Sequence, residues 1–251
     1  MDILVERAEG VMTITFNRPE KKNAITSSMY RAMTDALAQA HDDASVRAIL
    51  IRGGAAAFSA GNDLEDFMKS PPTDADAPVL QFLRSISTVD KPVVASVAGV
   101  AIGIGTTLLL HCDIVYAAES AVFSLPFAQL GLCPEAASSL LLPRLCGHQL
   151  AAEKLLLGEP FDADEAHRMG IVNRLLPAAE LEAFAFGQAT KLAALPASSL
   201  RVTKMLMKRA HAHEVAERMN DEVVHTGKML LSPEAREAMT AFFQKRRPDF
   251  R

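Results

Sequence analysis

Residues 92–112, PVVASVAGVAIGIGTTLLLHC, carry no formal charge, and this run restricts the fold more than any other feature of the chain. Its length would suffice for a membrane-spanning helix. However, Pro92, Gly99, Gly103 and Gly105 interrupt it, and Val-Val-Ala-Ser-Val is typical of a strand. The run therefore predicts a buried strand, a glycine-containing turn and a buried helix.

Strand-like and helix-like segments alternate up to about residue 180. Two β-like runs, ILVER and VMTITF, flank Glu9-Gly10 and predict a hairpin. A helix capped by Thr26 or Ser27 follows, and further strands are predicted at VRAILIR, VVASVAGV, DIVYAA, AVFSL and IVNRLL. This alternation predicts an α/β architecture, in which Ser70 to Pro78 is the most loop-like stretch.

The chain after Glu180 has no convincing strand signal. Its apolar spacing predicts helices over 181–194, 198–211, 214–230 and 233–246. Because such helices are too apolar to stand alone, we expect them to pack on a neighbouring surface and to favour oligomerisation.

The composition argues against several classes of partner. A net charge of -4, 6% aromatic residues and no Trp disfavour a nucleic-acid surface. Cys112, Cys133 and Cys146 are widely spaced in apolar segments, which favours buried thiols over disulfides or a metal site. The N-terminal MDILVERAEG lacks an apolar leader and the C-terminal RPDFR matches no peroxisomal signal, so we expect a cytoplasmic protein that binds neither metal nor membrane.

Two strand-to-helix junctions rich in small residues stand out. GGAAAFSAGNDL spans 53–64 and GVAIGIG spans 99–105. Small residues at the start of a helix leave backbone N–H groups uncovered, so the two junctions could direct two N–H groups at one oxyanion. The alternative is that the glycines serve only the backbone conformation. Neither junction has the spacing of a dinucleotide or P-loop motif.

Glu135 is the only charged residue between Glu119 and Arg144. One interpretation is a helix-start acid, because Pro134 suits a first helical position and acids are favourable in the first turn. The other is a buried base, since the surrounding Leu, Phe and Ala residues would desolvate the carboxylate and raise its pKa. The residues alone leave both open.

The motifs together resemble the crotonase, or enoyl-CoA hydratase/isomerase, superfamily over essentially the whole chain. The resemblance lies in NRPEKKNAI, AFSAGNDL, VAGVAIGIGTTLLLHCDIVYAAESAVFSLPFAQLGL, LLLGEPFDADEAHRMGIVNRLLP and EAMTAFFQKRRPDF. It implies an α/β fold, a spiral of ββα turns over 1–190, followed by a helical oligomerisation region over 191–251. It also implies an acyl-CoA thioester ligand with no separate cofactor, and a homotrimer or a dimer of trimers.

The resemblance also implies roles for individual residues. The backbone N–H groups of Asn62 and Ile104 would hold the thioester carbonyl. The other implied contacts with the acyl-CoA involve the backbone of Ala60 and Leu64 at the adenine ring, the side chains of Lys21, Lys22 or Lys245 at the phosphates, and Phe127.

The positions of the glutamates indicate which branch of the superfamily the chain resembles. Hydratases of this superfamily carry two glutamates, and Thr107 and Phe127 stand at those positions, where neither side chain can activate water. LPFAQLGLCPEAASS instead resembles the peroxisomal-type Δ3,Δ2-enoyl-CoA isomerases, with their single glutamate at Glu135. We therefore expect an isomerase for 3-enoyl-CoA. The alternatives are another crotonase-type hydratase or hydrolase, and an acyl-CoA-binding protein without activity.

Overall fold

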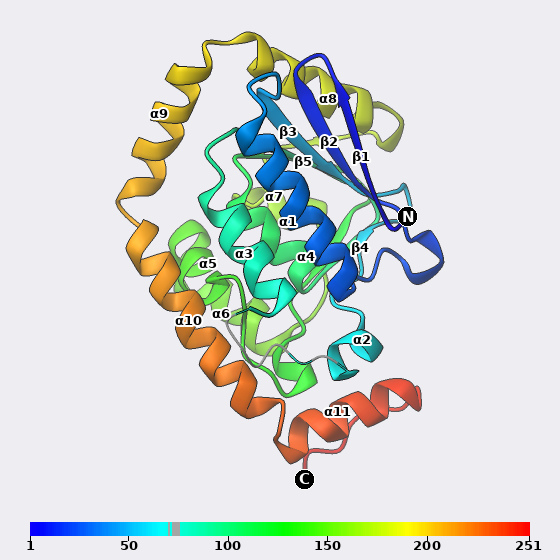
Figure 1. The fold of residues 1–251 in the computed structure, drawn as a ribbon. Helices are drawn as coiled ribbons and strands as arrows, with labels where there is room; N and C mark the ends of the chain where they lie inside the picture. Colours follow the sequence, from blue (N-terminus) through cyan, green and yellow to red (C-terminus); the bar gives the residue numbers. More distant parts are fainter. Residues whose placement is uncertain (70, 72–75) are drawn as a thin grey trace.

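The computed structural model describes residues 1–69, 71 and 76–251, so most of the loop predicted at 70–78 lies outside the described residues. Its strands form two sheets (Figure 1). The six-stranded sheet has the order β1 (Ile3–Ala8), β2 (Val11–Phe16), β3 (Ala48–Arg52), β5 (Val93–Val97), β7 (Ile114–Ala118), β10 (Arg174–Leu176). The four-stranded sheet has the order β4 (Ala57–Ser59), β6 (Val100–Ile102), β8 (Val122–Ser124), β9 (Phe161–Asp162).

Successive pairs of strands along the chain extend both sheets. The pairs β3 and β4, β5 and β6, and β7 and β8 each place one strand in each sheet, and equivalent strands of successive pairs are parallel. Helical segments follow the pairs: α2 (Leu64–Lys69) and α3 (Pro78–Thr88), then α4 (Ile104–Thr107) and the 3-10 helix η2 (Leu108–His111), then the 3-10 helix η3 (Ala128–Leu130) and α5 (Ser138–Cys146). Each ββα unit adds one strand to both sheets, which confirms the predicted α/β spiral.

The N-terminal hairpin and the helix after it form as predicted. β1 and β2 pair in antiparallel register, and Glu9 and Gly10 have φ of 52° and 76° in the connecting turn. Positive φ at both central residues is typical of tight hairpin turns whose twist matches that of the strands. Thr26 caps α1 (Ser27–Asp42) by accepting a hydrogen bond from the Met29 N–H.

The charge-free run 92–112 departs from the prediction in one respect. The stretch VVASVAGV, predicted as one strand, is divided between β5 and β6, which belong to different sheets. Gly99 lies at the division with φ of +64°, where a Cβ would collide with the carbonyl of Ala56. The chain therefore turns from one sheet to the other at a residue that must be glycine, and a hydrophobic run alone does not reveal such a turn.

Helices cover both faces of the larger sheet. The main core includes the buried residues Met29, Met33 and Leu37 of α1 and Phe82 and Ile86 of α3. On the other face, α8 (Ala178–Ala194) packs against β3, β5 and β7 in a second apolar cluster. Both faces of β5 are thus buried, which explains its uninterrupted apolar sequence.

The predicted helical tail is confirmed within a few residues at each end. It consists of α9 (Ala197–Arg209), α10 (Ala212–Met229) and α11 (Pro233–Phe243), which follow one another down one side and across one end of the molecule (Figure 1). The predicted boundary at residue 190 falls inside α8, which packs on the sheet. The remaining short helices are η1 (Pro19–Lys21), α6 (His148–Ala152), the π-helix η4 (Glu153–Leu157) and α7 (Ala163–Arg168).

A buried lysine connects this tail to the sheet. Lys204 of α9 is 6% exposed, and its ammonium donates to Asp113 Oδ2 at 2.6 Å and to the Lys91 carbonyl at 2.7 Å. The same Asp113 oxygen accepts the Val93 N–H at 2.8 Å. Removing one member of such a buried pair leaves the other charge uncompensated.

We predict that Lys204→Met lowers the free energy of unfolding by about 3 kcal/mol, because Asp113 keeps its charge and loses its cation. Arg201→Met on the same helix is the control, since Arg201 lies 3.7 Å from Asp90 with half of its side chain exposed. Its loss should cost less than about 1 kcal/mol. Urea denaturation of both variants checks this, and equal losses would contradict the prediction.

Candidate active site

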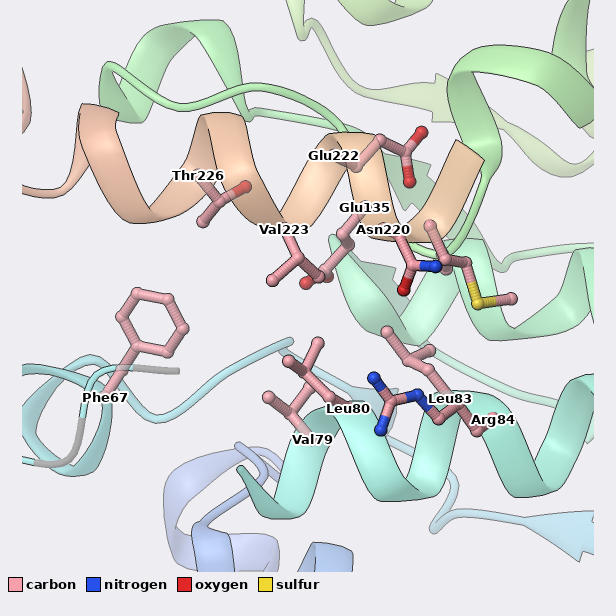
Figure 2. Close-up of a pocket in the computed structure, with 12 residues that line it drawn as sticks. Phe67, Val79, Leu80, Leu83, Arg84, Glu135, Asn220, Glu222, Val223 and Thr226 are labelled. Atoms are coloured by element: carbon pink, nitrogen blue, oxygen red, sulfur yellow. The ribbon is translucent and has the colours of Figure 1, made fainter. Parts of the chain in front are cut away.

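A largely apolar pocket lies between α3 and α10 (Figure 2). Its empty space, counted together with the open solvent at its mouth, is about 530 Å³. Glu135 contributes a carboxyl group to the wall, and Figure 2 shows it directed into the space between the two helices. The other lining residues are Phe67, Val79, Leu80, Leu83, Arg84, Ala136, Met219, Asn220, Glu222, Val223 and Thr226.

The two small-residue junctions predicted to form an oxyanion hole lie side by side. Asn62 follows β4 and Ile104 follows β6, and these strands are parallel neighbours. At Gly61, which has φ of +90°, a Cβ would lie 2.8 Å from the Ile102 carbonyl, so glycine permits the close approach of the two loops. In the part of the chain that the structure describes, the N–H groups of Asn62 and Ile104 donate no hydrogen bond.

Glu135 precedes its helix rather than starting it. Helix α5 begins at Ser138, after Ala136 and Ala137 with φ of 61° and 54°. The interpretation of Glu135 as a first-turn acid beside Pro134 is therefore wrong. The two left-handed alanines reverse the chain directly after Glu135, a geometry that the sequence gives no reason to expect because alanine rarely adopts it.

One oxygen of the Glu135 carboxyl group is shielded from water, while the residue as a whole is half-buried. Its Oε1 atom is buried and has no hydrogen-bond partner among the described residues. The pKa of Glu135 is raised to about 8, chiefly by burial and next by the negative charge of the neighbouring Glu222, against a smaller lowering by a hydrogen bond from the Asn62 side chain. A carboxylate in this setting is a far stronger base than one in water.

Tyr30 of α1 orients the Asn62 side chain and was missed at the sequence level. It is buried, and its hydroxyl donates to Asn62 Oδ1 at 2.5 Å. With the amide oxygen so engaged, the Asn62 NH₂ group is the part left to face Glu135. Tyr30 sits in the buried stripe of an ordinary amphipathic helix, so its sequence context indicates only a core residue.

Glu222 of α10 is a second buried acid that sequence reasoning missed. It is 5% exposed, and its carboxylate accepts hydrogen bonds from the N–H groups of Ala137 at 2.7 Å and Ser139 at 3.1 Å, and from the Ser139 hydroxyl at 2.5 Å. Nothing in the sequence separates it from the exposed acids around it on the same helix.

The residues expected to contact coenzyme A are only partly brought together. The Ala60 N–H donates to the Lys22 carbonyl at 2.9 Å, so the exposed Lys22 and its neighbour Lys21 lie next to the first small-residue junction. Leu64 begins α2 at the same junction. Lys245 is exposed beyond the end of α11, and no contact joins it to these residues within the described ranges.

Phe127 and Thr107 occupy the two positions discussed for hydratase glutamates. Phe127 is buried in the main core and is absent from the residues that line the pocket. Thr107 is fully buried, and its hydroxyl has no hydrogen-bond partner in the described chain. Neither side chain supplies a group that titrates near neutral pH.

Residues 1–69, 71 and 76–251, which the structure describes, were also compared with the requirements of a metal site, a membrane span and a reactive cysteine. Within these ranges no group of three or more His, Cys, Asp or Glu residues could hold a metal ion, and no helix has the length and apolar character needed to span a bilayer. Cys112, Cys133 and Cys146 are free, as predicted, and partly rather than fully buried. Burial raises the pKa of the Cys112 thiol to about 12, which disfavours its reactive thiolate form near neutral pH.

Comparison with known proteins shows the family. A model of the enoyl-CoA hydratase/isomerase family matches residues 6–251. The chain is 36% identical to the probable enoyl-CoA hydratase echA8 of Mycobacterium tuberculosis, over 99% of this chain and 97% of that protein. It is 35% identical to enoyl-CoA delta isomerase 2 of Rattus norvegicus, over 97% of this chain and 64% of that protein.

A solved structure agrees with this result. The crystal structure of an enoyl-CoA hydratase/isomerase from Pseudoalteromonas atlantica T6c superposes with a TM-score of 0.95 at 40% sequence identity, and the match covers 100% of both chains. The sequence motifs, the two-sheet spiral and these matches agree, and the chain belongs to the crotonase, or enoyl-CoA hydratase/isomerase, family.

Proposed function

We propose that this protein is an acyl-CoA isomerase that moves the double bond of a 3-enoyl-CoA to the 2-position. One observation carries the proposal: the Glu135 carboxyl group, whose Oε1 is buried without a hydrogen-bond partner, lies in an apolar pocket and is contacted by the Asn62 side chain. Asn62 belongs to one of the two neighbouring loops whose N–H groups, at Asn62 and Ile104, donate no hydrogen bond within the described residues. A base and an oxyanion site are the two parts that transfer of a proton next to a thioester requires.

The proposed reaction uses one base twice. Glu135 removes a proton from C2 of the substrate, and the electrons of that C–H bond form a dienolate whose oxygen accepts hydrogen bonds from the Asn62 and Ile104 N–H groups. Glu135 then returns the proton to C4, and the double bond comes to lie between C2 and C3. No atom is gained or lost, and the proposed steps use no separate cofactor.

The pocket walls suit the acyl part of such a substrate. Val79, Leu80 and Leu83 of α3 face Val223 of α10 across the pocket (Figure 2), and apolar walls favour a hydrocarbon chain. We place the adenine ring near the backbone of Ala60 and Leu64 and the phosphates near Lys21 and Lys22, with Lys245 and Phe127 as the less supported contacts. Coenzyme A is thus part of the substrate.

Hydration of a 2-enoyl-CoA is the second candidate function. It is favoured by the name of the echA8 relative and by the presence of two acids, Glu135 and Glu222, at one pocket. Against it, both oxygens of Glu222 already accept hydrogen bonds from Ala137 and Ser139, so Glu222 is poorly disposed to activate water. Assays with 3-enoyl-CoA and crotonyl-CoA in parallel separate the candidates, since hydration without isomerisation would favour the second.

We also propose a homotrimer or a dimer of trimers. The surfaces of α9 and α11 expose apolar side chains that a monomer would leave in water: Val202, Met205, Leu206, Met207, Phe242 and Phe243. Sedimentation analysis reports the state directly, and a monomer at micromolar concentration would contradict this assignment.

We predict that Glu135→Gln lowers kcat for 3-enoyl-CoA isomerisation by at least about a thousandfold, because the amide cannot accept a proton. Binding of a saturated acyl-CoA should change less than about threefold, since the amide has nearly the same shape and apolar walls dominate the pocket. The exposed Glu159→Gln is the matched control. Isomerisation by Glu135→Gln at the wild-type rate would refute the proposal.

We predict that kcat/KM for isomerisation rises with pH along a limb centred near pH 8. The base must be deprotonated to act, and burial holds the pKa of Glu135 at about 8 in the free protein. Because Glu222 lies close, the limb reports the apparent pKa of the pair. Rates measured from pH 6 to 9 test this, and a constant kcat/KM over that interval would be inconsistent with Glu135 as the base.

We predict that Glu135→Gln becomes more stable relative to the wild type as pH rises. The pKa of Glu135 is raised on folding, so the folded wild type binds this proton more tightly than the unfolded chain and loses stability as pH rises toward 8. The difference between variant and wild type should grow by on the order of 3 kcal/mol from pH 5 to pH 8. Denaturant unfolding measures it, with Glu159→Gln showing no such trend.

A further inference from the structure

The carboxylate of Glu222 is buried at the active-site wall but takes no part in the proposed proton transfer. It belongs to α10, in the tail whose expected task is oligomerisation. We propose that Glu222 is a positioning residue for Glu135: it holds the backbone of residues 137–139 and, as a second negative charge, strengthens Glu135 as a base. This inference rests on the proposed function for its catalytic consequence, but its physical content can be measured without turnover.

The backbone after Glu135 needs external support. Ala136 and Ala137 both have left-handed backbone conformations, each of which costs a residue with a Cβ about 1 kcal/mol or more. Such a conformation persists only where the surroundings fix it. Since this double reversal sets the direction in which the Glu135 side chain leaves the loop, whatever fixes it also positions the carboxyl group.

Glu222 supplies most of that support. Its Oε2 accepts the Ala137 N–H at 2.7 Å, and its Oε1 accepts both the N–H and the hydroxyl of Ser139. On the other side of the turn, His111 Nε2 lies 2.8 Å from the Ala136 carbonyl oxygen. The turn is therefore held at its N–H groups by Glu222 and at a carbonyl by His111, and hydrogen bonds to a charged acceptor are the stronger kind.

The same hydrogen bonds favour an ionised Glu222. Three donors stabilise its carboxylate against the burial that raises its pKa. The negative charge acts on Glu135, where it adds to burial in raising the pKa. Burial lowers the pKa of His111 to about 4, so His111 contributes no charge near neutral pH. Among the described residues, other titratable or charged groups near the pair are Arg84 of α3, Tyr30 of α1, Cys133 and Arg218.

The direct test is a carboxyl-carbon NMR titration of protein labelled with ¹³C at its glutamate side chains. The Glu135 signal is identified by its loss in Glu135→Gln. In Glu222→Gln, which keeps the shape and removes the charge, we expect the pKa of Glu135 to fall by on the order of one unit. Asp221→Asn, an exposed neighbour on the same helix, is the control. An unchanged Glu135 titration in Glu222→Gln would overturn the inference.

Kinetic measurements then distinguish the effect of the Glu222 charge from its effect on the position of Glu135. In Glu222→Gln the acidic limb of kcat/KM should move to lower pH by the same amount, and kcat on the plateau should fall about tenfold. Glu222→Asp keeps the charge on a shorter side chain, so the limb should stay in place while kcat falls. If Glu222→Gln does not fold, Glu222→Asp decides alone, and an unchanged kcat would refute the positioning role. A wild type without isomerase activity refutes the proposed function, whereas the NMR titration still tests Glu222.

Discussion

The exclusion of water from one carboxyl group is the constraint on which the rest of this site depends. Glu135 is a strong base only while the apolar side chains of α3 and α10 keep its charged form poorly solvated. The fold tolerates this cost because the sheets and α1 bury a large apolar core of their own. Stability gained in the core thus offsets a destabilising feature kept at the site, and the two regions adjoin, since Val79, Leu80 and Leu83 belong both to the core and to the pocket wall.

Much of the fold could be predicted from the sequence because its elements have strong local signals. The hairpin follows from Glu9-Gly10 between two apolar runs, and the tail helices follow from their spacing. The division of 93–102 between two sheets could not be predicted in this way, since the apolar pattern continues through Gly99 and only the close approach of Ala56 shows why the chain must turn there. Local patterns carry no information about such contacts between distant segments.

The same distinction between local signals and distant contacts applies to the residues of the candidate site. The junctions that contain Asn62 and Ile104 stand out by their small residues, and the resemblance to the family assigns the N–H roles to those two residues. Glu135 stands out as a lone charge in an apolar stretch. Tyr30 and Glu222 act through contacts with residues far along the chain, on helices whose own sequences are unremarkable amphipathic ones. Phe127 has a clear position in the aligned motifs, but in the structure it is a core residue that does not line the pocket.

The late position of α10 in the chain has a consequence for the completeness of the pocket. The loop containing Glu135 and the junctions containing Asn62 and Ile104 all precede α9 and α10 in the chain. Without α10, the pocket would lack the wall that Met219, Val223 and Thr226 supply, and we would expect Glu135 to be a weaker base. The completeness of the pocket therefore depends on a helix from the last fifth of the chain, far in sequence from the loops that contain Asn62 and Ile104.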